Sequence, residues 1–163
     1  MQNRFPHLFT PLVVRSKTIK NRIVSSPHGD PQMFVVSPNG HCDFTDHAVT
    51  YYGNIARGGA GIVNTGHLNV DPRFYIGRNK ESFNFFSENV HGHTLPTLHK
   101  MTDLIHSYGA LAGFELNHGG QVSTPLSGNV VPGPCDLVLE NGKVVRAMDE
   151  EEMDLVAEYF AAA

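Results

Sequence analysis

The stretch "GAGIVNTGHLNV" (residues 59–70) decides the fold of this chain. Small residues come first, the apolar pair Ile62 and Val63 follows, and then the sequence turns polar at residues 64–67. A turn of small residues before a short apolar run is typical of a buried strand. We therefore predict a strand over residues 61–65, and we expect Thr65, Gly66 and His67 to face a ligand where that strand ends.

Helical patterns flank this strand. Before it, Ala48, Tyr52 and Ile55 recur at helical spacing, and the pair Gly58–Gly59 ends the run. After it, a helix is predicted from Thr94 to residue 109.

A third helix is predicted to begin at Asp149, with Glu152 three residues later in a variant of the capping box. Met153, Val156 and Phe160 form its apolar stripe. The stretch between residue 117 and this helix is rich in Gly, Pro and Ser, and we expect a long polar loop there.

Further strands are predicted over residues 22–26, stopped by Pro27, and over residues 110–116. Residues 11–14 and 17–20 are expected to form a small hairpin at the N-terminus. Strands and helices alternate, which is typical of an α/β fold with a parallel sheet. An open doubly wound sheet remains an alternative, but "SSPHGDPQ" lacks the Gly-x-Gly-x-x-Gly of a dinucleotide fold. The pattern favours a partial (β/α)8 TIM barrel: the first three β/α units with an N-terminal hairpin.

Composition excludes several classes of function. The chain has 163 residues and a formal net charge of -4, and its 12 Lys and Arg are scattered, so nucleic acid is not an expected partner. No apolar run is long enough to cross a membrane and no secretory leader is evident, so we expect a cytoplasmic protein without membrane contact. Cys42 and Cys135 lie far apart and are interpreted as free thiols.

Four segments resemble, in order and spacing, the N-terminal part of the old yellow enzyme family. They are "LFTPLVVRSKTIKNRIVSSPHG" (8–29), "YYGNIARGGAGIVNTGHLNV" (51–70), "HKMTDLIHSYGALAGFELNHGGQ" (99–121) and "AMDEEEMDLVAEYFAAA" (147–163). The nearest branch is that of the NADH:flavin oxidoreductases, which includes 2-enoate and 2,4-dienoyl-CoA reductases. The resemblance implies an FMN-binding TIM barrel that takes hydride from NADH or NADPH and reduces activated C=C bonds of small enoate or enone substrates. It also implies a possible homo-oligomer in the full-length enzyme.

The resemblance implies flavin-binding roles at particular positions. Ser26, Pro27, His28 and Gly29 match residues that lie along the flavin, largely through their backbone; methionine is frequent where this chain has His28. His67 stands where the family usually has Ala or Gly close to the isoalloxazine.

Glu115 stands where the family usually has a Gln that bonds the pyrimidine edge. A carboxylate accepts a hydrogen bond from flavin N3–H but cannot donate one to O2. It also disfavours an anionic reduced flavin unless it is protonated. His118 matches a motif histidine behind the flavin contacts, and Gln121 stands where the family often has Arg.

By the same resemblance, the substrate-anchoring pair, a catalytic Tyr and the phosphate-binding loops of the family lie beyond Ala163, so no catalytic residue is assigned here. We expect residues 1–163 to be the incomplete N-terminal portion of the domain, which alone does not retain FMN or reduce enoates. The alternative is a non-catalytic half-barrel that does not bind flavin by itself.

Plainer interpretations stand beside these. His91, His93, His99 and His118 could supply metal ligands, but no Cys or carboxylate lies at a recognisable spacing, so no metal site is predicted. His28 and His67 are also typical of strand-end histidines bonded to a carbonyl. Glu115 interrupts an apolar run, so its alternative role is a buried ion pair with Arg22 or Lys20. Tyr51 and Tyr52 are interpreted as helix packing, and residues 150–152 as a solvated first helical turn.

Overall fold

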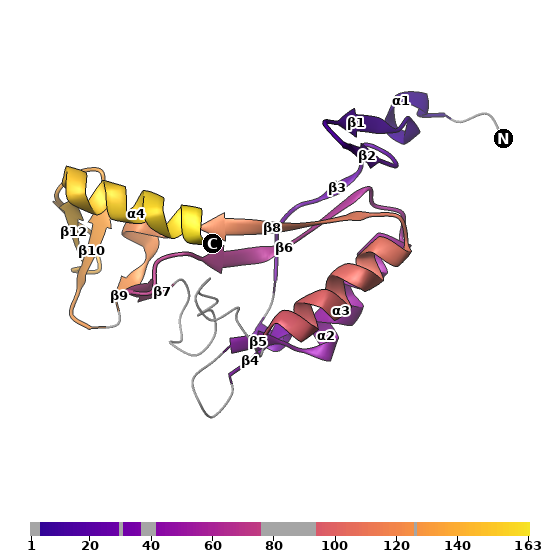
Figure 1. The fold of residues 1–163 in the computed structure, drawn as a ribbon. Coiled ribbons are helices and arrows are strands. Elements are labelled where there is room, and N and C mark those ends of the chain that lie inside the picture. Colours follow the sequence, from indigo (N-terminus) through magenta and orange to yellow (C-terminus); the bar gives the residue numbers. More distant parts are fainter. Residues whose placement is uncertain (1–3, 30, 37–41, 76–93, 126) are drawn as a thin grey trace. The chain divides into compact units, whose positions relative to one another are not determined.

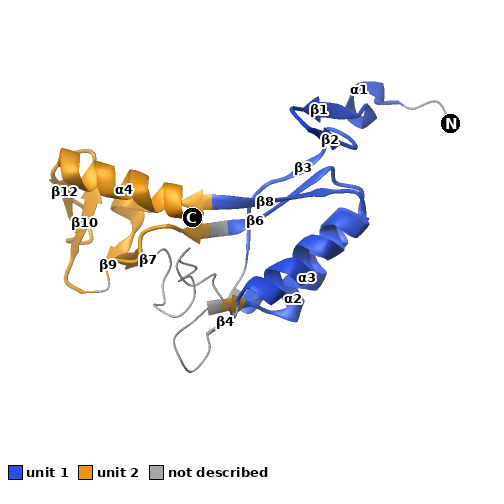
Figure 2. Cartoon of the chain, viewed as in Figure 1, with its two compact units in different colours: residues 1–34, 44–67, 94–115 blue, residues 35–43, 68–93, 116–163 orange. Residues whose placement is uncertain are grey.

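The computed structural model describes residues 4–29, 31–36, 42–75, 94–125 and 127–163 (Figure 1). Contacts divide the chain into two compact units (Figure 2). Unit 1 comprises Met1–Phe34, Phe44–His67 and Thr94–Glu115; unit 2 comprises Val35–Asp43, Leu68–His93 and Leu116–Ala163. Strands β6 (Ile62–Asn69) and β8 (Leu111–Asn117) begin in unit 1 and end in unit 2.

The remaining elements follow the chain. They are α1 (Pro6–Phe9), β1 (Leu12–Val14), β2 (Lys17–Ile19), β3 (Val24–Ser25), the 3-10 helix η1 (Pro31–Met33), β4 (Phe34–Val36), β5 (Cys42–Phe44), α2 (Asp46–Arg57), β7 (Phe74–Tyr75), α3 (Thr94–Ser107), the 3-10 helix η3 (Gly120–Val122), β9 (Thr124–Pro125), β10 (Val130–Gly133), β11 (Leu137–Val138), β12 (Val144–Ala147) and α4 (Glu150–Ala162).

The sheet of unit 1 has the predicted strand order, β3-β6-β8. β3 and β6 run parallel, with Val24 opposite Ile62 and Ser25 opposite Val63. The backbone N–H of Leu111 at the start of β8 donates to the Gly61 carbonyl at 2.9 Å, which pairs the next strand. The predicted N-terminal hairpin is also confirmed, because β1 and β2 pair antiparallel.

The lengths of two strands differ from the prediction. β3 is shorter than residues 22–26, and β6 continues to Asn69 rather than ending at Thr65. Thr65 and Gly66 therefore lie inside a strand, and the fully buried Thr65 does not face a ligand, contrary to expectation. The strand continues because β8 runs beside it: at the far end the Val70 N–H donates to the Asn117 carbonyl at 2.9 Å.

Helices α2 and α3 pack against each other on one side of these strands (Figure 1). Thr45 is the N-cap of α2, and its hydroxyl accepts from the Ala48 N–H at 3.3 Å. At the other end, Gly58 donates to the Asn54 carbonyl at 2.9 Å, so the helix ends at the glycine pair as predicted. The core of unit 1 comes mainly from these helices: Ala48, Val49, Tyr52 and Ala56 of α2, and Leu98, Met101 and Ile105 of α3.

Unit 2 corrects the expectation of a long polar loop. Residues 130–147 form a three-stranded sheet of order β10-β12-β11. β10 runs parallel to β12, and β11 pairs antiparallel with it. Val131 and Val145 are each 1% exposed and form the core of this sheet. Short apolar runs form strands here because each strand pairs with β12 or, in the case of β12, with both neighbours.

The last helix begins as predicted. Asp149 is its N-cap, and the side chain accepts a hydrogen bond from the Glu152 N–H at 2.9 Å. The predicted apolar stripe is largely uncovered, since Met153 and Phe160 are 49% and 39% exposed. None of the helices that the structure describes is long and apolar enough to span a bilayer.

Candidate functional site

Asn64 ties the three strands of unit 1 together at one level. Its amide donates to the Ser25 carbonyl of β3 at 3.0 Å. On the other side, a Cβ added to Gly113 of β8 would lie 2.0 Å from Asn64 Oδ1, so a larger residue there would require the Asn64 side chain to move. Pro27 lies two residues after the end of β3, whereas Gly66 and Glu115 lie within β6 and β8, which continue to Asn69 and Asn117.

The Tyr52 hydroxyl joins the segment after β3 to strand β6. It donates to the His28 carbonyl at 2.7 Å and accepts the Gly66 N–H at 3.0 Å, while its side chain is fully buried. A Cβ on Gly66 would lie 3.2 Å from the His28 carbonyl oxygen, so the two backbones approach closely. The four residues Ser26, Pro27, His28 and Gly29 are all exposed. The segment that follows β3 is therefore accessible to solvent.

The imidazole of His28 is held against helix α2. Its Nδ1 lies 2.9 Å from the Ser26 carbonyl, and its Nε2 bonds to the Tyr51 hydroxyl. A carbonyl only accepts, so Nδ1 carries the proton and Nε2 accepts from Tyr51. His28 therefore has the strand-end histidine arrangement, and both ring nitrogens are engaged within the protein. Neither ring nitrogen of His28 is therefore free to bond a ligand.

Glu115 is exposed, not buried as its apolar neighbours suggested. Among the described residues its carboxylate forms no hydrogen bond or ion pair. The alternative ion pair with Lys20 or Arg22 is not formed: Lys20 Nζ donates to the Tyr108 carbonyl at 2.6 Å, and Arg22 forms no ion pair with a carboxylate in the described part of the chain. Glu115 is thus an open acceptor at the sheet edge. His67 belongs to β6, and its side chain lies outside the described part of the structure.

Unit 2 contains a buried charge cluster that the sequence did not indicate. Asp71 is fully buried, and Arg73 binds it with Nε at 2.9 Å from Oδ1 and Nη2 at 2.7 Å from Oδ2. His118 Nε2 lies 3.2 Å from the same Oδ2. Burial raises the pKa of Asp71, but the hydrogen bonds from His118 and Arg73 outweigh it, so the pKa lies well below its usual range. The hydrogen bond that Arg73 donates to Asp71 in turn raises the pKa of Arg73.

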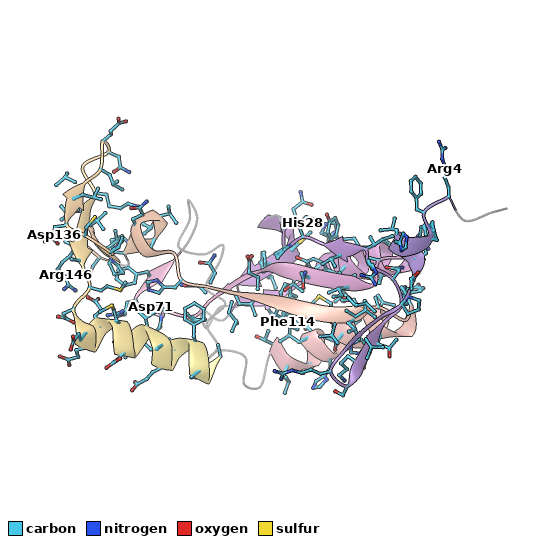
Figure 3. All side chains as sticks on the ribbon, turned by 90° about the horizontal axis from the view of Figure 1, so that it is seen from above. Arg4, His28, Asp71, Phe114, Asp136 and Arg146 are labelled. Carbon is cyan, nitrogen blue, oxygen red and sulfur yellow. The ribbon has the colours of Figure 1, made fainter. Side chains whose placement is uncertain are left out.

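Glu152 extends this cluster to helix α4. Its carboxylate contacts Arg73 Nη1 at 3.4 Å and Arg146 Nη2 at 2.5 Å, and the residue is 9% exposed. The interpretation of residues 150–152 as a solvated turn is therefore wrong at Glu152, although Glu150 and Glu151 are exposed. Figure 3 labels Asp71 and Arg146 in this unit, and His28 in unit 1.

Sequence reasoning missed Tyr52, Asn64 and Asp71 as organising residues. Tyr52 was read as packing, and nothing in helical spacing reveals a hydroxyl that bridges the segment after β3 and strand β6. Asp71 had a local signal in "DPR": Pro72 stops the strand, and an Asp before such a turn bonds backbone two residues on, as its 2.9 Å contact with the Arg73 N–H shows.

The histidines form no metal centre within the described ranges. No group of three or more His, Cys, Asp or Glu side chains there is arranged to hold a metal ion. His99 is exposed on α3, and His118 bonds Asp71. His91 and His93 lie outside the described residues. Cys135 is an exposed free thiol.

Comparison with known proteins agrees with this fold. The model of the NADH:flavin oxidoreductase / NADH oxidase family matches residues 7–163. A 4,4'-dithiodibutanoate disulfide reductase from Rhodococcus erythropolis is 30% identical over 122 residues, which is 75% of this chain and 27% of that protein. The chain thus spans about a quarter of the length of this relative.

Solved structures share the fold at lower identity. Old Yellow Enzyme from Pichia sp. AKU4542 superposes with a TM-score of 0.72 at 17% identity, over 96% of this chain and 41% of that one. Morphinone reductase in complex with tetrahydroNAD gives a TM-score of 0.68 at 21% identity, over 96% of this chain and 45% of that one. The strand-end site, the α/β order and the family match over nearly the whole chain lead to one conclusion: this chain belongs to the NADH:flavin oxidoreductase / NADH oxidase family.

Proposed function

We propose that this chain forms a flavin-binding wall of an FMN-dependent oxidoreductase that passes hydride from NADH or NADPH to the activated C=C bond of a small enoate or enone. FMN supplies the hydride chemistry when bound, and the protein holds and orients it. The observation that carries the proposal is that Tyr52 holds the exposed segment 26–29 after β3 beside Gly66 of β6, while the exposed Glu115 lies on β8 of the same sheet.

The donor and acceptor groups of these residues fit one side of a flavin ring. Glu115 is an open acceptor, which suits the N3–H of the pyrimidine edge. Residues 26–29 offer backbone rather than side chains, because the His28 imidazole already bonds to Ser26 and Tyr51. Tyr52 holds the His28 carbonyl and Gly66 at a fixed separation, so this wall is organised before a ligand binds.

Ring recognition is tested by comparing FMN with riboflavin, which lacks the phosphate. Each is titrated into the chain, and flavin fluorescence is followed. Because the wall contacts the ring, we expect saturable binding of both, with affinities that agree within about twofold, and no competition by ribose 5-phosphate. Binding of FMN but not riboflavin would contradict the ring contact.

The substrate class is tested separately. Chain with bound FMN is reduced by NADH without oxygen and mixed with a 2-enoate or with its saturated analogue, and formation of the saturated acid is measured against free FMN. The proposal expects reduction of the enoate above the free-flavin rate in a polypeptide that completes the site. Flavin binding without any enoate reduction in that completed polypeptide would contradict the proposed substrate class.

A further inference from the structure

His118 and Asp71 meet at the carboxyl ends of neighbouring strands within unit 2. His118 directly follows β8, and Asp71 lies two residues after the end of β6. The Val70 N–H donates to the Asn117 carbonyl at 2.9 Å, which holds the two strand ends side by side. The His118 side chain is 10% exposed, and that of Asp71 is 0% exposed. The pair is therefore fixed by the backbone on both sides.

The surroundings determine which nitrogen of His118 carries a proton. Asp71 already accepts from the backbone and guanidinium of Arg73, and its pKa lies well below the usual range, so it is an ionised, acceptor-only group. The nitrogen that faces it, Nε2, must then be protonated. The charged groups around the pair already balance, with Asp71 and Glu152 negative and Arg73 and Arg146 positive. A neutral imidazole therefore leaves Nδ1 as a bare lone pair.

No group within the described residues occupies that lone pair. The one contact of the His118 ring there is with Asp71. Among the described side chains, the one fully buried polar atom without a partner is Ser123 Oγ, so Nδ1 is not sealed inside the protein. It is open to water or to a small molecule.

We propose that His118 is a proton-accepting group at this strand edge and that Asp71 is its positioning residue. The ligand class is a small molecule that presents an O–H or N–H group. The proton moves from that group to Nδ1, and the conjugate base keeps the electron pair of the broken bond. The imidazolium that forms keeps Nε2–H on Asp71, whose negative charge stabilises it. The idea that this O–H or N–H group belongs to an oxidoreductase substrate rests on the function proposed above. The assignment of the proton to Nε2 does not depend on that function.

Nitrogen NMR of the chain labelled with 15N-histidine tests the proposal without flavin. The H118Q variant identifies the His118 signals by their loss. In the neutral imidazole we expect a proton on Nε2 and none on Nδ1. In D71N this preference for the Nε2 proton should weaken, because the ionised acceptor becomes a neutral amide that can also donate. D71E should restore part of this preference.

The control is D154N, which removes an exposed carboxylate of α4 without touching His118. It should leave the His118 signals unchanged. A neutral wild-type form with its proton on Nδ1 would overturn the proposal, as would the same ratio of the two neutral tautomers in wild type and folded D71N. If D71N does not fold, the wild-type proton position alone decides. Failure of the chain to bind flavin would leave this test intact, so the two proposals fail separately.

Discussion

The hydroxyl of Tyr52 accepts the backbone N–H of Gly66 at 3.0 Å and donates to the His28 carbonyl at 2.7 Å. One buried side chain of α2 therefore sets the distance between the segment that follows β3 and strand β6. Helix and sheet edge are coupled through this single oxygen, which makes Tyr52 more than a packing residue.

Removing that oxygen should destabilise unit 1. In Y52F the Gly66 N–H and the His28 carbonyl lose a buried partner, and an unsatisfied buried group costs about 1 to 3 kcal/mol. We expect the free energy of unfolding, measured with urea, to fall by that amount. Y51F is the matched control: its hydroxyl bonds the exposed His28 imidazole, so the loss should stay below about 1 kcal/mol. Equal losses in the two variants would contradict this role of Tyr52.

Two adjacent glutamates of α4 should respond differently to the same change. Glu152 contacts Arg73 and Arg146 and is 9% exposed, whereas Glu151 is exposed. E152Q removes the carboxylate partner of Arg146 and the second carboxylate partner of Arg73, which keeps Asp71, and should cost about 1 to 3 kcal/mol of unfolding free energy. E151Q should stay within about 0.5 kcal/mol of wild type, as surface changes usually do. Similar urea midpoints for both variants would show that the cluster does not stabilise unit 2.

Acid should weaken the fold through Asp71. Its pKa in the folded chain lies well below the unfolded value, so the ionised form contributes stability above about pH 4, near the unfolded pKa. That contribution is lost as pH falls from there toward the lower folded pKa. Urea midpoints measured between pH 7 and pH 3 should fall more steeply on acidification in wild type than in D71N. Parallel pH profiles would exclude Asp71 as the titrating group. D46N, which changes an exposed carboxylate, should follow the wild-type profile.

Glu115 should respond to conversion to an amide. In E115Q the side chain can still accept from flavin N3–H and can also donate to O2. One additional hydrogen bond is worth about 1 kcal/mol, so FMN affinity should rise roughly fivefold in a fluorescence titration. E140Q, at an exposed turn of unit 2, should leave the affinity unchanged. Unchanged affinity in E115Q would remove this residue from the flavin edge.

The sequence predicted the parts of the fold that local patterns encode. Hydrophobic spacing located α2 and α3, the Asp149 cap located the start of α4, and apolar runs located the three strands of unit 1 in their order. The small sheet β10-β12-β11 was missed because its strands are short and interrupted by Gly and Pro, so that only their mutual pairing stabilises them.

The sequence indicated which residues belong to the candidate site, but not which atoms of these residues bond to one another. Side-chain bonds over long sequence separations, such as Asn64 to Ser25 or Arg73 to Glu152, leave no periodic signal. Apolar neighbours also suggested that Glu115 is buried, but the residue is exposed within β8. Its flavin contact stays a prediction. Resemblance to a family supplied the flavin roles, which physical patterns alone did not indicate.

The most direct test of the flavin wall is backbone amide NMR of the chain titrated with FMN. The account predicts that the amide signals of Ser26, His28, Gly29, Gly66 and Glu115 shift together and saturate with one dissociation constant, however weak the binding. Shifts confined to unit 2, or an absence of shifts at these five amides while others saturate, would contradict it.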